Sequence, residues 1–216
     1  MSVITVERKV LEKNDMIAAQ NRELFQRRKL FVINLLSSPG SGKTSLIEKT
    51  IQSIGDGIRV AVIEGDVQTD IDAQRINKLN VPVVQIVTNG GCHLEARLVR
   101  DSFEKIRDSE FDFLIIENVG NLVCPAGYDL GENEKVVILS VAEGDDKPLK
   151  YPAMFLRAKV LIINKIDLLP YTDSIIEEIK SNALKINSQL KIFETSCRTG
   201  DGINEWCAWI KTKINK

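Results

Sequence analysis

Short runs of consecutive apolar residues alternate with longer amphipathic stretches along most of the chain. Consecutive apolar positions are typical of strands covered on both faces, and the intervening segments space their apolar residues as helices do, as at Leu94, Leu98 and Ile106. Regular alternation of strand and helix predicts an α/β fold, a mostly parallel sheet with helices on both faces. Seven strands are expected, at residues 30–36, 58–64, 83–87, 111–118, 135–141, 159–164 and 191–195.

Residues 3 to about 28 predict one helix before the first strand, with Val3, Val10 and Leu24 among many charged residues. The spacing of its apolar residues is imperfect. Two interpretations stay open: the helix packs along the edge of its own domain, or it docks a partner or a second subunit. No repeat or linker interrupts the chain, so we expect one domain over residues 1–216, with residues 1–28 as an N-terminal helical extension.

Composition narrows the class of protein. The 216 residues are 44% hydrophobic and 27% charged, which excludes a disordered or fibrous chain. The 29 basic and 30 acidic residues leave a net charge of −1, which argues against nucleic acid as a partner. No apolar run approaches the length of a membrane-spanning helix, and charges interrupt the N-terminus where a signal peptide would be apolar. We therefore expect a cytoplasmic protein without membrane insertion.

A phosphate-binding loop is predicted directly after the first strand. Its sequence, SSPGSGKTS, is nearly that of a P-loop, with Ser37 in place of the usual first glycine. In such loops backbone N–H groups surround phosphate oxygens, the lysine (Lys43) reaches the β and γ phosphates, and the next hydroxyl (Thr44) ligates Mg²⁺. The strand before and the helix after support this prediction. The nucleotide-binding residues expected here are Pro39, Gly40, Ser41, Gly42, Lys43, Thr44 and Ser45.

A base-binding segment is predicted at the end of the sixth strand, where Asn164, Lys165 and Asp167 form an N-K-x-D sequence. The Asp167 carboxylate can accept hydrogen bonds from both N1–H and the 2-amino group of guanine, whereas adenine has no donor at these places. Ligands bind at the carboxyl ends of strands in open α/β sheets. GTP or GDP is thus the expected nucleotide, with Ser196, Cys197 and Arg198 as a second base-contacting loop.

Two acidic segments between these motifs are candidates for Mg²⁺ and the γ phosphate. Asp66 follows the second strand and is assigned to the first switch. Glu117 follows the fourth strand, and Gly120 has an N–H that can bond the γ phosphate. One hydroxyl and one or two carboxylates suffice for Mg²⁺. The predicted catalytic residues are Lys43, Asp66, Glu117 and Gly120, and the predicted Mg²⁺ ligands are Thr44, Asp66 and Glu117.

A thiol and imidazole cluster is predicted at the same edge of the sheet. Cys92 and His93 follow the third strand, and Cys124 lies a few residues past Gly120. Thiolate and imidazole suit Zn²⁺ or Ni²⁺. From the residues alone, metal ligands, inert thiols and redox groups all remain open. Three ligands are too few to complete a tetrahedral site, but a two-fold dimer would double the number of ligands. Cys207 is expected in the core and not in this cluster.

Together these motifs resemble the hydrogenase nickel-incorporation GTPases, the HypB family. The resemblance covers residues 30 to 210 and is carried by SSPGSGKTS, EGDVQTDIDAQR, GGCHLEA, ENVGNLVCP, EGDDKPLKYP and NKIDLLPY. It implies a SIMIBI-class P-loop GTPase that forms a homodimer with GTP and inserts nickel into [NiFe] hydrogenase. It also implies that Cys92, His93 and Cys124 bind Ni²⁺ or Zn²⁺ at the dimer interface.

The resemblance further implies two protein partners, a HypA-type nickel and zinc chaperone and the precursor of the hydrogenase large subunit. The N-terminal helix is the expected dock for the first. For Lys147 and Lys150, in the KPLK segment, contact with phosphate and contact with the opposite subunit both stay open. We expect slow intrinsic GTP hydrolysis, because these motifs contain no evident arginine finger.

Three alternatives are weighed against this function. The urease accessory GTPases also handle nickel, but arrange their metal ligands as Cys-Pro-His in one segment, whereas here the proline follows Cys124 and the histidine follows Cys92. A non-catalytic, nucleotide-gated metal-binding module that recruits a partner is the alternative from another class. A related ATPase with an extra lysine early in its P-loop is disfavoured, because Ser38 stands at that position.

Overall fold

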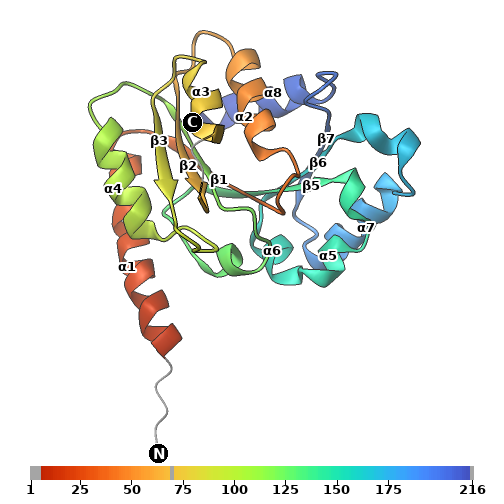
Figure 1. The fold of residues 1–216 in the computed structure, drawn as a ribbon, viewed down its shortest axis with the longest axis horizontal. Coiled ribbons are helices and arrows are strands. Elements are labelled where there is room, and N and C mark those ends of the chain that lie inside the picture. The colour runs from red at the N-terminus through yellow and green to blue at the C-terminus, as the bar shows by residue number, and fades with distance from the viewer. Residues whose placement is uncertain (1–5, 69–70, 215–216) are drawn as a thin grey trace, which may run out of the picture.

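Seven parallel strands form the centre of the molecule in a computed structural model that describes residues 6–68 and 71–214. Their order is β3-β2-β4-β1-β5-β6-β7, and each neighbouring pair is parallel (Figure 1). The predicted α/β fold with a parallel sheet is thereby confirmed. The strands are β1 (Phe31–Ser37), β2 (Val60–Asp66), β3 (Val83–Val87), β4 (Phe113–Glu117), β5 (Glu134–Ser140), β6 (Val160–Asn164) and β7 (Lys191–Thr195).

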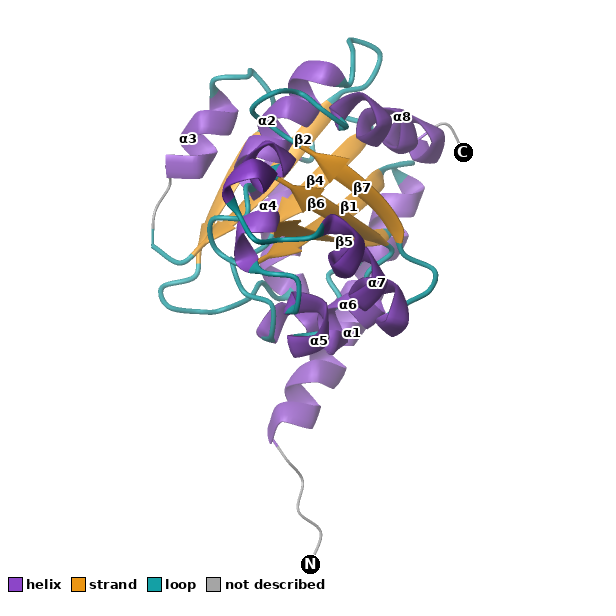
Figure 2. Cartoon of the chain, turned by 90° about the vertical axis from the view of Figure 1, so that its right-hand side faces the viewer, coloured by secondary structure: helices purple, strands orange, loops and turns teal. Residues whose placement is uncertain are grey.

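Helices cover both faces of this sheet. Figure 2 shows α2 and α8 on one side and α1, α6 and α7 on the other. Within the described residues, none of the helices is long and apolar enough to cross a bilayer. The helices are α1 (Val6–Arg27), α2 (Lys43–Ser53), α3 (Ile71–Asn77), α4 (Ala96–Ile106), α5 (Lys147–Lys150), α6 (Pro152–Arg157), α7 (Ile176–Ile186) and α8 (Ile203–Ile214), with 3-10 turns η1 (Cys124–Gly127), η2 (Val141–Glu143) and η3 (Ile166–Tyr171).

The strands are buried on both faces, which explains their uninterrupted apolar sequences. Side chains alternate across a strand. In β1, Ile33 belongs to the core shared with α2 and α8, which includes Trp206. Its neighbour Val32 belongs to the opposite core, shared with α1 and α4. A third core, against α6 and α7, contains Phe155. The carboxyl ends of the strands thus lie at one edge, which carries the loops discussed below.

The N-terminal helix α1 lies alongside α4, as Figure 1 shows at the left of the molecule. It matches the helix predicted over residues 3 to about 28, except that Val3 lies outside the described residues. Ala18 and Phe25 are buried, while Val10 and Met16 are exposed. The helix therefore packs along the edge of its own domain, as the first interpretation expected, and docking of a partner there stays a prediction.

Candidate nucleotide and metal site

The predicted phosphate loop joins β1 to α2 and surrounds a cavity of about 440 Å³. Gly42 has φ +102°, and a Cβ on it would lie 2.5 Å from Nδ2 of Asn164, so only glycine fits there. Lys43 is 9% exposed and its Nζ donates to Oγ of Ser37 at 2.9 Å. The ammonium group is held over the loop, as the predicted role requires. Residues 39, 40 and 42–45 line the cavity, while Ser41 is buried behind it.

Thr44 and Glu117, predicted as Mg²⁺ ligands, lie together at the floor of the cavity. Oγ1 of Thr44 donates to Oε1 of Glu117 at 2.9 Å. Burial raises the pKa of Glu117 to about 7, although Lys43 and the Thr44 hydrogen bond favour the ionised form. Oε2 of Glu117 is buried and, within the described part of the chain, accepts no hydrogen bond. A buried carboxylate oxygen without a donor fits a site for a hydrated Mg²⁺ ion.

A second group of acids, Glu64, Asp66 and Asp72, borders the same cavity with carboxylate oxygens within 4.8 Å of one another. Asp66 was predicted to lie here, in the acidic segment that begins at Glu64, but no role was predicted for Glu64 itself or for Asp72. Burial and, to a lesser extent, the neighbouring Glu117 charge raise the pKa of Glu64 to about 8. The cavity therefore holds more acid than one Mg²⁺ ion requires.

Replacing Glu64 by glutamine is expected to stabilise the nucleotide-free protein at pH 8 by on the order of 2 kcal/mol. The folded pKa is about 8 and the ordinary value is 4.5, so between these values the folded state holds a proton that the unfolded chain has released. Stability from this group falls as pH rises, and a neutral side chain removes that loss. Urea unfolding with chelator at pH 5 and pH 8 measures it. A Glu64→Gln advantage no greater at pH 8 than at pH 5, or one matched by the exposed Glu104→Gln, would contradict the assignment.

The predicted base-binding residues form an adjoining pocket of about 390 Å³. Asn164, Lys165, Asp167, Cys197 and Arg198 all line it. Asn164 donates from Nδ2 to the carbonyl of Ser41 at 2.9 Å, and Lys165 donates from Nζ to the carbonyl of Gly40 at 2.6 Å. These bonds tie the base pocket to the phosphate loop.

The second base loop is fixed to Asp167. Oγ of Ser196 donates to Oδ1 of Asp167 at 2.6 Å and accepts from the backbone N–H of Arg198 at 3.2 Å. Burial raises the pKa of Cys197 to about 11, so this thiol stays protonated at neutral pH. Cys207 is buried in the core beside α2, as expected. The structure thus separates these two cysteines from the thiol and imidazole cluster.

Cys92, His93 and Cys124 come together as predicted. One ligand atom of each lies within 4.8 Å of the others, and Sγ of Cys92 lies 3.5 Å from Nδ1 of His93. All three side chains are partly exposed. Two thiols and an imidazole at this separation fit a single Ni²⁺ or Zn²⁺ ion and leave coordination positions to be filled from outside the chain.

The protonation of the cluster also suits a soft metal. Burial lowers the pKa of His93, so its ring is neutral at pH 7 and has a lone pair for a metal. The ring stacks on Tyr128 with centroids 3.8 Å apart. The hydrogen bond with Cys124 raises the pKa of Cys92, so metal binding must displace a proton.

Asn118, which sequence reasoning missed, joins the nucleotide cavity to the metal cluster. It follows Glu117 directly and is 1% exposed. Its Oδ1 accepts from the backbone N–H of Leu94 at 3.1 Å and of Val119 at 3.0 Å. Leu94 is the residue after His93. A polar residue at the end of a buried strand was the only sequence signal for it.

Two further side chains, those of Arg75 and Lys147, lie beside the cavities, and that of Lys150 does not. Arg75 lines the phosphate cavity but pairs with Glu48 at 2.6 Å and with Asp72 at 3.1 Å. Lys147 borders a smaller cavity next to Gly120, with its Nζ 5.6 Å from the ring centre of Tyr151. Lys150 pairs with Asp146 at 2.6 Å. The structure therefore places Lys147, and not Lys150, next to the phosphate loop.

The fold and these two cavities define a P-loop nucleotide-binding protein of the GTPase type, with a thiol and imidazole cluster beside the nucleotide site. Residues 31–194 match the sequence family described as CobW/HypB/UreG, nucleotide-binding domain. The hydrogenase maturation factor HypB of Azotobacter chroococcum mcd 1 is 52% identical, covering 97% of this chain and 68% of that protein.

Solved structures agree with this match. The crystal structure of HypB from Helicobacter pylori in complex with nickel is 40% identical, with a TM-score of 0.90 and coverage of 94% of this chain and 95% of that one. HypB from Archaeoglobus fulgidus is 37% identical, with a TM-score of 0.88 and coverage of 94% and 99%. This chain belongs to the HypB family of hydrogenase maturation factors.

Proposed function

We propose that this chain is a GTP-hydrolysing metallochaperone that couples GTP-dependent dimerisation to nickel binding and delivery during [NiFe] hydrogenase maturation. Its relatives are named hydrogenase maturation factors, and the Helicobacter pylori relative was crystallised with nickel. The observation that carries the proposal is the hydrogen bond from Leu94 N–H to Asn118, because it joins the segment after Glu117 to the segment after His93.

Hydrolysis requires water to attack the γ phosphorus while the bond to the GDP oxygen breaks. Bound Mg²⁺, held by Thr44, Glu117 and Asp66, would offset the charge of the phosphates. Lys43 lies where its ammonium group can neutralise charge on the β and γ oxygens, and Gly120 lines the same cavity. Glu117 has a buried oxygen available to orient water. Turnover is slow, because the charge of Arg75 is offset by two carboxylates.

Nickel is the cargo of this reaction, held by Cys92, His93 and Cys124, with the second subunit of a dimer completing the set. A nucleotide-dependent shift of residues 117–120 moves Cys124 along the chain and moves the Cys92 and His93 segment through Asn118. The coupling is reciprocal, so bound metal must change the affinity for nucleotide or for the second subunit. Recipients are a HypA-type chaperone and the precursor of the hydrogenase large subunit, in the cytoplasm, where free thiols persist.

One comparison favours a further recipient. The Helicobacter pylori relative is named hydrogenase/urease maturation factor HypB and is 41% identical over 94% of this chain. Nickel delivery toward urease is therefore a candidate additional role.

The decisive experiment measures mass and metal content by size-exclusion chromatography with light scattering. With Ni²⁺ and a non-hydrolysable GTP analogue, we expect a dimer that retains metal, and with GDP a monomer that retains at least tenfold less. Cys92→Ala is expected to lose the metal, because it removes one of only three ligands in each subunit.

The matched control is Cys207→Ala, which removes a thiol buried in the core away from the cluster. It should retain wild-type metal content. A monomer that holds no metal with either nucleotide would overturn the proposal, and a metal-free wild type that still hydrolyses GTP would leave only the nucleotide function.

A further inference from the structure

The face of α1 that packs on the domain contains two buried amides. Asn14, Ala18, Asn21 and Phe25 follow one another along this face at helical spacing and are 5%, 0%, 0% and 2% exposed. Burying an amide is unfavourable unless its polar atoms are hydrogen-bonded, and an apolar side chain would suffice for packing. The two asparagines therefore call for a specific explanation.

Both asparagines bridge the same two stretches of chain. Nδ2 of Asn14 donates to the carbonyl of Asp129 at 2.8 Å, and its Oδ1 accepts from the N–H of Ala96 at 2.8 Å. Nδ2 of Asn21 donates to the carbonyl of Ala96 at 2.8 Å and to that of Leu130 at 3.0 Å. Its Oδ1 accepts from Nε of Arg100 at 2.8 Å. One helix thus hydrogen-bonds to two segments that are distant in sequence.

These two stretches are the continuations of the metal-binding loops. Ala96 is the first residue of α4 and lies three residues after His93. Asp129 lies five residues after Cys124. The first N–H groups of a helix have no partner within it, so the bond from Ala96 N–H to Asn14 also fixes where α4 begins. The two asparagines therefore help to set the distance between the loop that contains Cys92 and His93 and the loop that contains Cys124.

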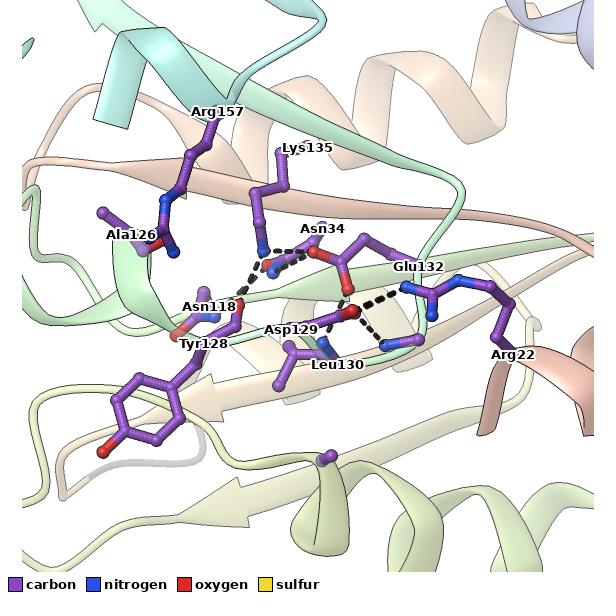
Figure 3. Close-up of polar contacts among 12 residues, drawn as sticks. Arg22, Asn34, Asn118, Ala126, Tyr128, Asp129, Leu130, Glu132, Lys135 and Arg157 are labelled. Carbon is purple, nitrogen blue, oxygen red and sulfur yellow. Dashed lines mark hydrogen bonds and ion pairs between the residues drawn. The ribbon is translucent and has the colours of Figure 1, made fainter. Parts of the chain in front are cut away.

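Further contacts hold the second loop to α1. Figure 3 shows Arg22 extending from α1 to Asp129, where Nη2 lies 2.8 Å from both carboxylate oxygens. Burial opposes ionisation of Asp129, but hydrogen bonds from Arg22 and from Gly131 N–H hold its pKa below the ordinary value. Gly131 has φ +93°, and a Cβ there would lie 2.6 Å from Cβ of Asn21. The turn at Asp129 and the helix are therefore in direct contact.

The other side of this loop is held by the rest of the domain. Figure 3 shows Lys135 reaching the carbonyl of Tyr128 and Arg157 lying beside Ala126, to whose carbonyl its Nη1 donates at 2.8 Å. Tyr128 in turn stacks on His93. The loop that follows Cys124 therefore lies between fixed donors on the domain and donors on α1.

We propose that α1 braces the metal site and that Asn14 and Asn21 are its positioning residues. They hold the Cys92 and His93 loop and the Cys124 loop at the separation one metal ion needs, so a change in the docking of α1 changes metal affinity. The inference rests on the proposed nickel binding. Groups that orient metal ligands without touching the metal typically change affinity by about 10- to 100-fold. By linkage, bound metal must strengthen the docking of α1.

The test is the Ni²⁺ affinity of the double variant Asn14→Ala/Asn21→Ala in the full chain, measured by competition with a chromophoric chelator. We expect affinity about 10- to 100-fold weaker than wild type and a changed nickel–thiolate absorption band, with GDP affinity unchanged within twofold. A merely structural role for the asparagines would weaken both ligands together or neither.

Two controls match the change. Asn187→Ala also removes an amide that donates to backbone carbonyls, those of Phe155 at 3.1 Å and Ala158 at 2.9 Å, in the other half of the molecule. Gln20→Ala removes an exposed amide from α1 itself. Both should bind Ni²⁺ as wild type does. If Asn187→Ala weakens nickel binding as much as the double variant, the effect is general loosening and the brace is wrong.

Hydrogen exchange on the wild-type protein gives a result that needs no variant to fold. Amides of α1 are expected to exchange more slowly when Ni²⁺ is added, while amides of α8 are unchanged. Unchanged exchange of α1, in a protein that demonstrably binds Ni²⁺, would overturn the brace and leave the nickel proposal intact. A wild type that binds no Ni²⁺ would instead overturn the proposed function itself.

Discussion

Lys43→Ala is expected to lower the rate of GTP hydrolysis by at least about 100-fold, corresponding to roughly 2.7 kcal/mol of lost transition-state stabilisation. Lys43 is nearly buried and lines the phosphate cavity, and a neutral water that fills its place cannot supply the lost positive charge. The positive charge of Lys43 also lowers the pKa of Glu117, so the pKa of Glu117 should rise further when the lysine is removed. Single-turnover hydrolysis at saturating GTP measures the effect.

A matched control for this change is Lys105→Ala, which removes an exposed lysine from α4. It should hydrolyse GTP at the wild-type rate. Lys43→Ala with wild-type turnover would show that Lys43 does not reach the phosphates. Nickel binding without nucleotide should be unaltered, because Lys43 does not border the cysteine cluster. A wild-type protein that binds GTP but does not hydrolyse it would favour the non-catalytic, recruiting alternative.

Asp167→Asn is expected to weaken GTP binding by at least about 100-fold and to strengthen binding of xanthosine triphosphate. Asparagine has nearly the same shape and can still accept the hydrogen bond from Ser196. The asparagine amide group is a donor, and it would face the 2-amino group of guanine, which is also a donor. Xanthine has an oxygen at position 2, which can accept a hydrogen bond from the amide. Binding is measured by displacement of fluorescent GDP or of its xanthine counterpart.

The opposite changes in affinity for GTP and for xanthosine triphosphate distinguish a loss of base recognition from a general disruption of the pocket. A variant that loses affinity for both nucleotides has an altered pocket and would say nothing in favour of guanine recognition by Asp167. An unchanged GTP affinity would contradict that recognition directly. The control is Asp173→Asn, which should leave both affinities unchanged, because Asp173 lies three residues before α7 begins and lines neither cavity.

The sheet could be predicted from the sequence because each strand is apolar over its whole length. The predicted ends of the strands were less accurate. The second strand was expected at residues 58–64 but spans Val60–Asp66, since Ile58 lies in the preceding turn and Gly65 and Asp66 continue the pairing with β3. The fourth was expected at residues 111–118 but spans Phe113–Glu117. Backbone pairing, and not hydropathy, sets these limits.

Some residues of the candidate site could likewise be predicted from the sequence, and others could not. Motifs within one loop, such as the phosphate loop and the Cys92 and His93 pair, were visible in the sequence because their residues are adjacent. No role was predicted for Glu64, Arg75 or Asn118, because the burial of the Glu64 carboxylate and the contacts of Arg75 and Asn118 depend on how distant segments pack. The metal cluster was predicted in position, since the ends of β3 and β4 had to share one edge of the sheet.

The N-terminal helix shows why an amphipathic pattern can mislead. Its apolar spacing looked imperfect because two positions on the buried face are asparagines, while Val10 and Met16 point to solvent. In a hydropathy pattern an asparagine is assigned to the exposed face of a helix, whether or not its amide is buried. Only the hydrogen-bond partners at Ala96 and Asp129 reveal that this face is inside.

The central position of β1 has a consequence for synthesis of the protein. β1 pairs with β4 on one side and with β5 on the other, so it cannot complete its pairing until Ile138 has left the ribosome. By then Cys92, His93 and Cys124 have been translated, and they converge only when β3, β2 and β4 pair. Parallel pairing across such distances folds slowly. The proposed nickel site is therefore incomplete in a nascent chain until these strands have paired.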